Sequence, residues 1–284
     1  MEFGVATMVY YPGSTPRRAI LDSQSFGFRY LEISYEHFIK YIENNDLMRV
    51  KELQKSIVEV LETTQLKVLQ VHAPYGKVNY YMVADDVGLR KYATTLMEMW
   101  IEFCREVDCR TLVTHTGWAP PRVTVPYHKH IEIMLRKNIE FYRELSKVAK
   151  DKGVEIAIEN RLERVFGITP KDIAAIVSEV GSEVLGLCLD VGHAHINKLP
   201  IPEILQRYGS ILKATHIHDN NGEVDQHLPP YMGSIDWKTI IKAFKNINYS
   251  RPLIFEVAGD RVEEICRNRL YLLSKIRDIL AEET

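Results

Sequence analysis

Apolar residues along the chain are concentrated in eight short runs that are rich in β-branched side chains. These runs cover residues 3–10, 30–35, 67–75, 110–118, 154–160, 184–192, 212–219 and 252–258. Runs of this length and composition are typical of β-strands. A longer segment with helical spacing follows nearly every run, and strands that alternate with helices predict a parallel sheet.

The helical spacing is clearest in residues 127–151, where apolar side chains from Ile131 to Val148 recur three and four positions apart. The other predicted helices cover residues 40–63, 89–107, 170–180, 236–247 and 260–281. Gly153 and Gly181 follow two of the predicted helices and are expected to end them.

Eight strand–helix units in 284 residues predict a (β/α)8 TIM barrel of the α/β class. No linker or low-complexity tract divides the chain, so we expect residues 1–284 to form a single domain. Segments 76–88 and 117–127 are predicted to be enlarged loops after the third and fourth strands. In such a barrel, the active site is built at the C-terminal ends of the strands.

The composition is that of an ordinary globular protein, with 46% hydrophobic and 26% charged residues. No apolar run is long enough for a membrane helix, and the first residues do not have the pattern of a signal peptide. The four cysteines form no CxxC pair, which favours a reducing, cytoplasmic location. The net charge of −2 argues against nucleic acid as the partner. A homo-oligomer is compatible with the sequence.

Acidic and imidazole side chains recur where the predicted strands end. These positions are His72, His115, Glu159, Asp190, His193, His216, Asp225, His227 and Glu256. A carboxylate at the end of an apolar strand is costly to bury without a partner, so three of them beside histidines favour a metal site over separate caps or salt bridges. Such ligands suit Mn²⁺, Mg²⁺, Co²⁺ or Zn²⁺, and no organic cofactor is expected.

The stretch HIHDNNGEVDQH, residues 216–227, holds much of this chemistry. It is not an EF-hand calcium loop, because Val224 and Pro230 stand where that loop requires Gly and Glu. A solvated surface loop is the alternative interpretation. His218 shares a strand face with His216, and both a place in the site and a structural role are compatible with that spacing.

Several further side chains are candidates for contacts with a substrate. They are Tyr75, Tyr80, Tyr81, Trp118, Arg161, Arg164 and His218. An indole or phenol ring can form the wall of a sugar pocket, and an arginine can bind an anionic group. The two arginines are equally compatible with a solvated loop.

The motifs CLDVGHAH, HIHDNNGEVDQHLPPYMGSIDW and LIFEV resemble those of the xylose-isomerase-like barrel superfamily. The superfamily contains sugar isomerases and epimerases and also endonuclease IV, and the resemblance covers nearly the whole chain. The epimerase branch implies one divalent ion held by Glu159, Asp190, His216 and Glu256. It also implies that the two glutamates transfer the proton and that His193 binds a substrate oxygen.

This resemblance implies a metal-dependent isomerase or epimerase of a sugar, sugar phosphate or polyhydroxy ketone. Removal of a proton α to a carbonyl forms an enediolate, which a metal ion stabilises. A base on each face then allows the proton to return on the opposite side.

The endonuclease IV branch is the alternative, a zinc-dependent phosphodiesterase that acts on abasic DNA. It implies three zinc ions held by nine ligands, and each of the nine strand-end positions above has a suitable residue type. Two motifs depart from this branch: ENRLER replaces its glycine-rich stretch, and DVGH replaces its DTCH. Because of these departures we favour the isomerase branch.

Overall fold

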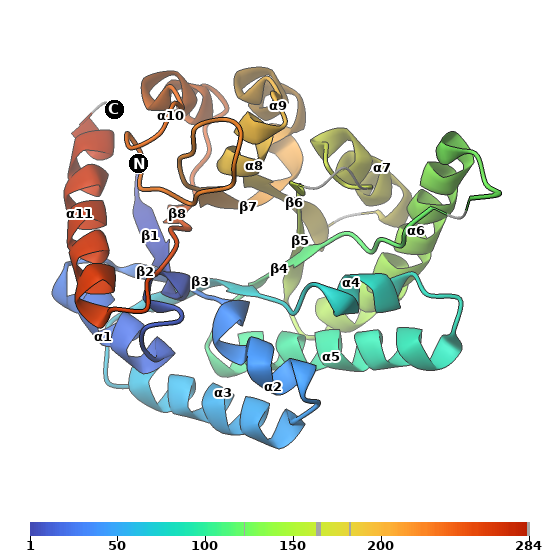
Figure 1. Ribbon diagram of the computed structural model, residues 1–284, viewed down its shortest axis with the longest axis horizontal. Helices are drawn as coiled ribbons and strands as arrows, with labels where there is room; N and C mark the ends of the chain where they lie inside the picture. The colour runs from blue at the N-terminus through green and yellow to red at the C-terminus, as the bar shows by residue number, and fades with distance from the viewer. Residues whose placement is uncertain (122, 163–165, 182, 283–284) are drawn as a thin grey trace.

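The chain folds into a closed barrel of eight parallel strands, each paired with its neighbours in sequence order (Figure 1). The computed structural model describes residues 1–121, 123–162, 166–181 and 183–282. The strands are β1 (Phe3–Ala6), β2 (Tyr30–Ile33), β3 (Lys67–His72), β4 (Thr111–His115), β5 (Glu155–Glu159), β6 (Leu185–Asp190), β7 (Leu212–Ile217) and β8 (Leu253–Phe255). Strand β8 closes the barrel on β1. The predicted (β/α)8 barrel is therefore confirmed.

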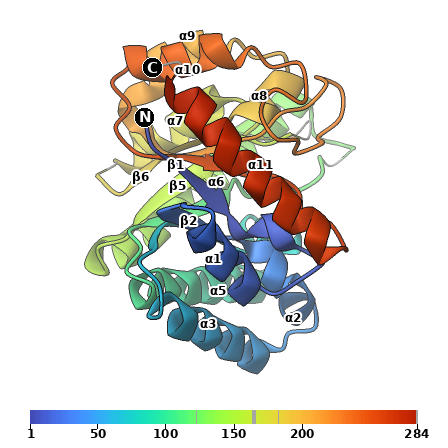
Figure 2. The ribbon, with the colours of Figure 1, turned by 90° about the vertical axis from the view of Figure 1, so that its left-hand side faces the viewer.

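Helices connect the strands on the outside of the barrel. They are α1 (Pro16–Ser25), α2 (Ile39–Glu43), α3 (Leu47–Leu61), α4 (Lys77–Met82), α5 (Val87–Glu106), α6 (Tyr127–Asp151), α7 (Pro170–Val180), α8 (Val191–Ile196), α9 (Ile201–Tyr208), α10 (Trp237–Asn246) and α11 (Glu263–Glu282). Short 3₁₀ turns cover Thr7–Tyr10, Tyr35–Phe38 and Gly209–Ile211. Helix α11 crosses the outer surface next to α1 (Figure 2). Among the described residues, no helix combines the length and apolar character needed to cross a membrane.

Three details of the predicted elements are wrong. The strands end earlier than the apolar runs, because the chain turns out of the barrel as soon as the hydrogen-bonded ladder ends. Segment 76–88, which was expected to be a loop, contains α4 and the start of α5. The predicted helix 40–63 is broken, because Asn45 has a φ of 53° and the side chain of Asp46 caps α3 by accepting a hydrogen bond from Arg49 N.

Helices α1, α8 and α9 were not predicted, because α8 and α9 are short and α1 carries few apolar side chains. By contrast, α6 has the predicted bounds. Gly153 and Gly181 follow α6 and α7 with φ values of 68° and 76°, a conformation that glycine adopts without a steric penalty. Residues 117–121 and 123–126 contain no helix or strand, as expected for an enlarged loop.

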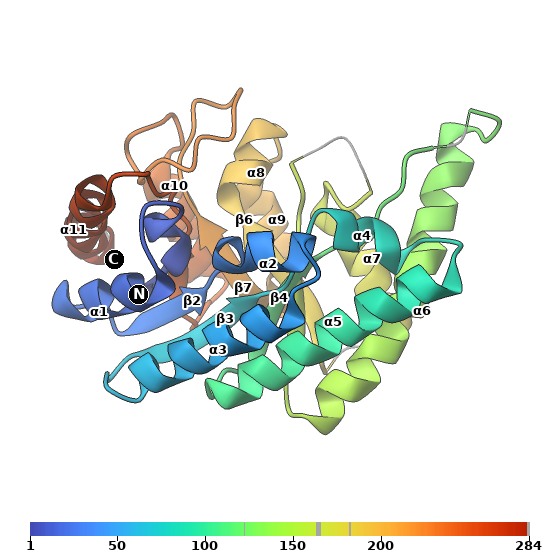
Figure 3. The same ribbon diagram turned by 60° about the horizontal axis from the view of Figure 1, so that its bottom comes forward.

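The barrel interior is apolar along the strands and polar at their C-terminal ends. Small apolar side chains, Val113, Ala157, Cys188 and Ala214, form a buried cluster inside the barrel. At the C-terminal end of the strands, the register sets His115 beside Glu159 and Asp190 beside His216. The long loop between β7 and α10 rises on the same side of the barrel as α8 (Figure 3). The fold thus brings strand-end polar groups from distant parts of the chain to one end of the barrel.

Asp219 organises the loop that follows β7, and its replacement tests how that loop is held. Its carboxylate accepts hydrogen bonds from Ile235 N at 3.2 Å and from Trp237 Nε1 at 2.8 Å, and its side chain is fully buried. We expect Asp219→Asn to lower the free energy of unfolding by about 1–3 kcal/mol, because an amide nitrogen would face one of these donors. Urea denaturation measures the change. Asp278→Asn, at an exposed position, is the control, and equal stability of the two variants would contradict the assignment.

Candidate functional site

Glu159, the last residue of β5, lies at the centre of the buried polar groups. Its Oε2 atom lies 3.0 Å from Nε2 of His115, 3.2 Å from Nε2 of His72 and 3.3 Å from Nδ1 of His216. Its Oε1 atom lies 3.3 Å from Nδ1 of His193. These imidazoles come from β3, β4, β7 and the first turn of α8, so one carboxylate joins four separate segments of the barrel.

Four side chains form a group that could hold a metal ion. One ligand atom from each of Glu159, Asp190, His216 and Glu256 lies within 4.8 Å of the others. Nδ1 of His216 is buried and has no hydrogen-bond partner among the described residues. That nitrogen lies 3.4 Å from Oε2 of Glu256 and 3.9 Å from Oδ2 of Asp190. A buried imidazole nitrogen that faces three carboxylates fits a divalent cation, because both ligand types bind such ions.

The opposite side of the His216 ring is held by Glu32 of β2. Nε2 of His216 donates a hydrogen bond of 2.7 Å to Oε2 of Glu32, and both side chains are fully buried. Nε2 of Gln70 donates to the same oxygen at 2.6 Å. A carboxylate that accepts from the far nitrogen of an imidazole fixes the tautomer and orients the near nitrogen toward a metal. Glu32 therefore leaves Nδ1 of His216 free to act as a ligand.

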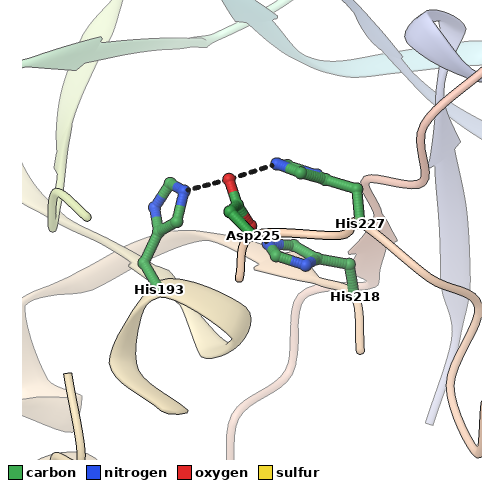
Figure 4. Close-up of side chains that lie close together, drawn as sticks. All are labelled: His193, His218, Asp225 and His227. Atoms are coloured by element: carbon green, nitrogen blue, oxygen red, sulfur yellow. Dashed lines mark hydrogen bonds and ion pairs between the residues drawn. The ribbon is translucent and has the colours of Figure 1, made fainter. Parts of the chain in front are cut away.

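A second group, His193, His218, Asp225 and His227, lies beside the first (Figure 4). Oδ2 of Asp225 lies 3.0 Å from Nε2 of His227 and 3.4 Å from Nε2 of His193. The rings of His218 and His227 stack with centroids 3.8 Å apart. Oδ1 of Asp225 and Nδ1 of His218 are buried without a hydrogen-bond partner in the described part of the chain. Three imidazoles and one carboxylate are a suitable ligand set for zinc.

Asp190 and Glu159 connect the groups to one another. Oδ1 of Asp190 lies 3.1 Å from Nε2 of His218, and Oδ2 of Asp190 lies 3.5 Å from Nδ1 of His193. Glu159 also forms a third group of possible metal ligands with His72 and His115. The structure thus brings together all nine strand-end residues named from the sequence, together with His218.

Burial and the neighbouring charges separate the pKa values of the two glutamates. Burial raises the pKa of Glu159, but the positive charges of His216 and His115 outweigh burial and hold this pKa well below its usual range. Burial raises the pKa of Glu256 to about 8, because the imidazoles near it only partly offset the desolvation of its carboxylate. Two carboxylates whose pKa values are pushed apart can act as a base and an acid.

The imidazoles fall into two classes, those whose pKa is raised and those whose pKa is lowered. Burial lowers the pKa of His72 and of His227, but hydrogen bonds to Glu159 and to Asp225 outweigh burial and raise both pKa values to about 9. The pKa of His216 is well above its usual range, because the negative charges of Glu256 and Glu32 outweigh burial. Burial dominates for His115 and His218, whose pKa values are lowered.

Of the other candidate substrate contacts, Trp118 and Arg161 follow β4 and β5, the strands that end in His115 and Glu159, and Tyr80 lies on α4. Trp118 is half-buried and its backbone N–H donates to Asn79 O at 3.1 Å. Arg161 donates from Nη1 to Thr116 O at 3.2 Å. Tyr80 is 44% exposed, on the outer side of α4. Arg164 lies outside the described residues.

Sequence reasoning missed Glu32, Gln70 and Asn160. Asn160 holds the end of β6 by accepting a hydrogen bond from Asp190 N at 2.9 Å, and its backbone oxygen accepts from Nδ1 of His193 at 3.0 Å. The signal for Glu32 was present, because YLEISY places a carboxylate in an apolar strand as IAIEN does. His193 was expected to end β6, but it lies in the first turn of α8.

Replacement of Glu32 tests its role behind His216. We expect Glu32→Gln to weaken the binding of Mn²⁺ or Zn²⁺ by about 10- to 100-fold, because the His216 ring would lose its charged acceptor. Calorimetric titration of the chelator-treated protein measures the affinity. The exposed Glu144→Gln is the control. Unchanged affinity in Glu32→Gln would show that Glu32 does not position the ligand.

The raised pKa values predict that metal binding releases protons. Below their raised pKa values, His216 and Glu256 carry protons, and a bound cation would displace them. We therefore expect the apparent affinity for Zn²⁺ to fall as the pH is lowered from 8 to 6, by about tenfold per pH unit for each proton displaced. Calorimetry at pH 7 in two buffers with different ionisation enthalpies counts the protons. A binding enthalpy independent of the buffer would contradict this expectation.

Comparison with known proteins agrees with this architecture. The chain is 30% identical over 237 residues to a D-psicose 3-epimerase of Enterocloster bolteae, an alignment that covers 82% of this chain and 73% of the epimerase. It resembles the crystal structure of a D-tagatose 3-epimerase-like protein, with 26% identity, a TM-score of 0.78 and coverage of 99% of each chain. The IolI protein, solved with a bound zinc atom, shares the fold, with 19% identity, a TM-score of 0.80 and coverage of 100% of this chain and 99% of IolI.

The family comparison extends over most of the sequence. Residues 20–277 match the xylose isomerase-like TIM barrel family. The matched range includes the strand ends that carry the candidate ligands, from His72 to Glu256. The chain therefore belongs to the xylose isomerase-like TIM barrel family.

Proposed function

We propose that this protein is a divalent-metal-dependent isomerase or epimerase. Its substrate would be a small sugar, a sugar phosphate or a polyhydroxy ketone, and the reaction would transfer a proton α to the carbonyl. The observation that carries the proposal is the convergence of Glu159 and Glu256 with Asp190 and His216, whose ligand atoms lie within 4.8 Å of one another. The similarity to D-psicose 3-epimerase supports the choice of reaction class.

The ligand set of the proposed metal is Glu159, Asp190, His216 and Glu256. A divalent ion held there, Mn²⁺, Mg²⁺, Co²⁺ or Zn²⁺, would stabilise the negative charge that develops when the proton leaves. The unpartnered Nδ1 of His216 and the convergent carboxylates support this assignment. The zinc atom bound to IolI is a precedent within the same fold.

The two glutamates would move the proton. Glu159, whose carboxyl has the lower pKa, would take the proton from one face of the substrate, and Glu256, whose carboxyl has the higher pKa, would return a proton to the other face. His193 would orient a substrate oxygen, since its Nδ1 is held by Asn160 O and its Nε2 faces Asp225. Trp118, Arg161 and His218 are the proposed contacts for the rest of the substrate.

A zinc-dependent phosphodiesterase that acts on abasic DNA is the second candidate function. The observation in its favour is that the described residues hold further groups of possible metal ligands next to the first, with Glu159 and Asp190 connecting them. The net charge of −2 argues against it, because binding to the phosphate backbone favours a basic protein.

We also propose three general properties of the protein from its sequence. Residues 1–284 would act as a single domain. The protein would be cytoplasmic, and it would be compatible with a homo-oligomer. None of these affects the assignment of the site.

Replacement of each glutamate by Gln tests the proton transfer. We expect Glu159→Gln and Glu256→Gln to reduce turnover by at least about 100-fold, because the amide cannot exchange the proton. Glu223→Gln, at an exposed position of the loop after β7, is the control. Metal content is measured in the same samples, because each glutamate is also a proposed ligand.

Solvent deuterium separates the two candidate functions. The metal-loaded protein is incubated in D₂O with a panel of ketoses, keto-polyols and their phosphates, and label at the carbon next to the carbonyl is followed by NMR. Incorporation that depends on Glu159 and Glu256 supports the isomerase. The absence of exchange across the panel, together with cleavage of an abasic duplex by the zinc-loaded protein, would replace it with the phosphodiesterase.

A further inference from the structure

A cavity lies at the C-terminal end of the barrel, on the side of the candidate site where Tyr75 contacts His72 and His115. We call it the tyrosine pocket, because the rings of Tyr35, Tyr75, Tyr81 and Tyr92 line it. Its volume is about 410 Å³, within the range of roughly 300–1,000 Å³ that is usual for small-molecule sites. The pocket is formed by the loops after β2 and β3 together with α2, α4 and α5, and Figures 1 and 3 show α2 and α4 on the same side of the barrel.

Tyr75 connects the tyrosine pocket to the candidate metal ligands. Its ring centroid lies 5.5 Å from that of His72 and 5.4 Å from that of His115, and both imidazoles contact Glu159. Its hydroxyl donates a hydrogen bond of 2.8 Å to Oε1 of Glu36, which fixes the orientation of the ring. Tyr75 thus lines the tyrosine pocket and at the same time contacts two imidazoles that are bound to Glu159.

The walls of the pocket suit a ring with flat apolar faces. Tyr35 and Tyr75 meet edge to face with centroids 4.9 Å apart, and Tyr81 and Tyr92 meet in the same way at 6.1 Å. Leu89 adds aliphatic surface. Phenol rings bind aromatic rings and the apolar faces of sugar rings through stacking and edge contacts.

The charges at the rim of the pocket favour a neutral occupant. Glu43 and Lys77 line the pocket and are both exposed, so one negative and one positive side chain stand at its edge. Neither sign of charge is favoured by this pair. Hydroxyl groups on the occupant would find donors and acceptors in these side chains and in the tyrosine hydroxyls.

We propose that the tyrosine pocket binds a neutral, ring-bearing substituent of the substrate. This inference rests on the proposed function and narrows its substrate class: the substrate is a keto sugar or keto-polyol that carries a second ring, either aryl or glycosyl, rather than a free monosaccharide. The reacting carbons lie at Glu159 and Glu256, and the second ring lies beyond Tyr75.

Binding of unreactive glucosides to the metal-loaded protein tests the proposal without turnover. The probes are methyl β-D-glucopyranoside, phenyl β-D-glucopyranoside and methyl β-cellobioside, which have no free carbonyl, and affinities are measured by ligand-observed NMR. We expect the phenyl compound or the cellobioside to bind at least about tenfold more tightly than the methyl glucoside, in line with the usual contribution of one stacked ring. The probe that gains affinity identifies the ring as aryl or glycosyl. Equal affinities for all three would overturn the proposal.

A variant that fills the pocket locates the gain in affinity. We expect Leu89→Trp to bring the affinity ratio close to one, with methyl glucoside affinity and metal content unchanged. Tyr271→Ala, at an exposed position on α11, is the control and should retain the ratio. A ratio retained in Leu89→Trp would overturn the proposal, and thermal melting confirms that each variant is folded.

The outcomes also separate this inference from the proposed function. If the ring preference is found in Glu256→Gln, which lacks the proposed acid, the pocket is established independently of the chemistry. If solvent deuterium exchange occurs with a simple ketose and no probe shows a ring preference, the isomerase stands and the pocket proposal falls.

Discussion

Four carboxylates, those of Glu32, Glu159, Asp190 and Glu256, are buried at one end of the barrel, and their negative charge must be balanced there. A buried charge without a partner is unfavourable by several kcal/mol, so imidazoles from strands β3, β4 and β7 and from α8 surround them. This balance constrains the strand ends, because each must present its polar side chain inward at the same height. A divalent cation would suit this end of the barrel, because one cation compensates the negative charge of several carboxylates at once.

The same network couples its members. Glu159 contacts four imidazoles, and Asp190 contacts His193, His218 and His216, so these two carboxylates connect the two four-residue groups of possible ligands. Substitutions in one group are therefore expected to change the pKa values and the metal affinity of the other, and their effects will not add. Glu32 and Asn160 belong to the same network. Glu32 positions His216 and Asn160 positions His193, and both imidazoles contact Glu159.

Family membership and substrate choice have different structural origins. The barrel is shared with a D-psicose 3-epimerase and a D-tagatose 3-epimerase-like protein, and the same architecture can serve several reactions. The loops after β2 and β3 line the tyrosine pocket, and Tyr75 links this pocket to the candidate metal ligands.

The order of the eight strands and the residue types at their ends were determined by the sequence alone, whereas α1, α4, α8 and α9 were not predicted. The apolar runs that alternate with helical segments indicated the strands, and the acids in IAIEN, CLDVG and IFEV indicated the site. Because parallel strands in a barrel bring their C-terminal ends together, these local signals were sufficient to predict one shared site. The sequence could not reveal that Glu32 lies behind His216 or that His218 stacks on His227, because these contacts depend on register and ring orientation across strands far apart in the chain. The tyrosine pocket was likewise decided only by tertiary structure, since Tyr35, Tyr75 and Tyr92 meet only when α2, α4 and α5 pack around the same space.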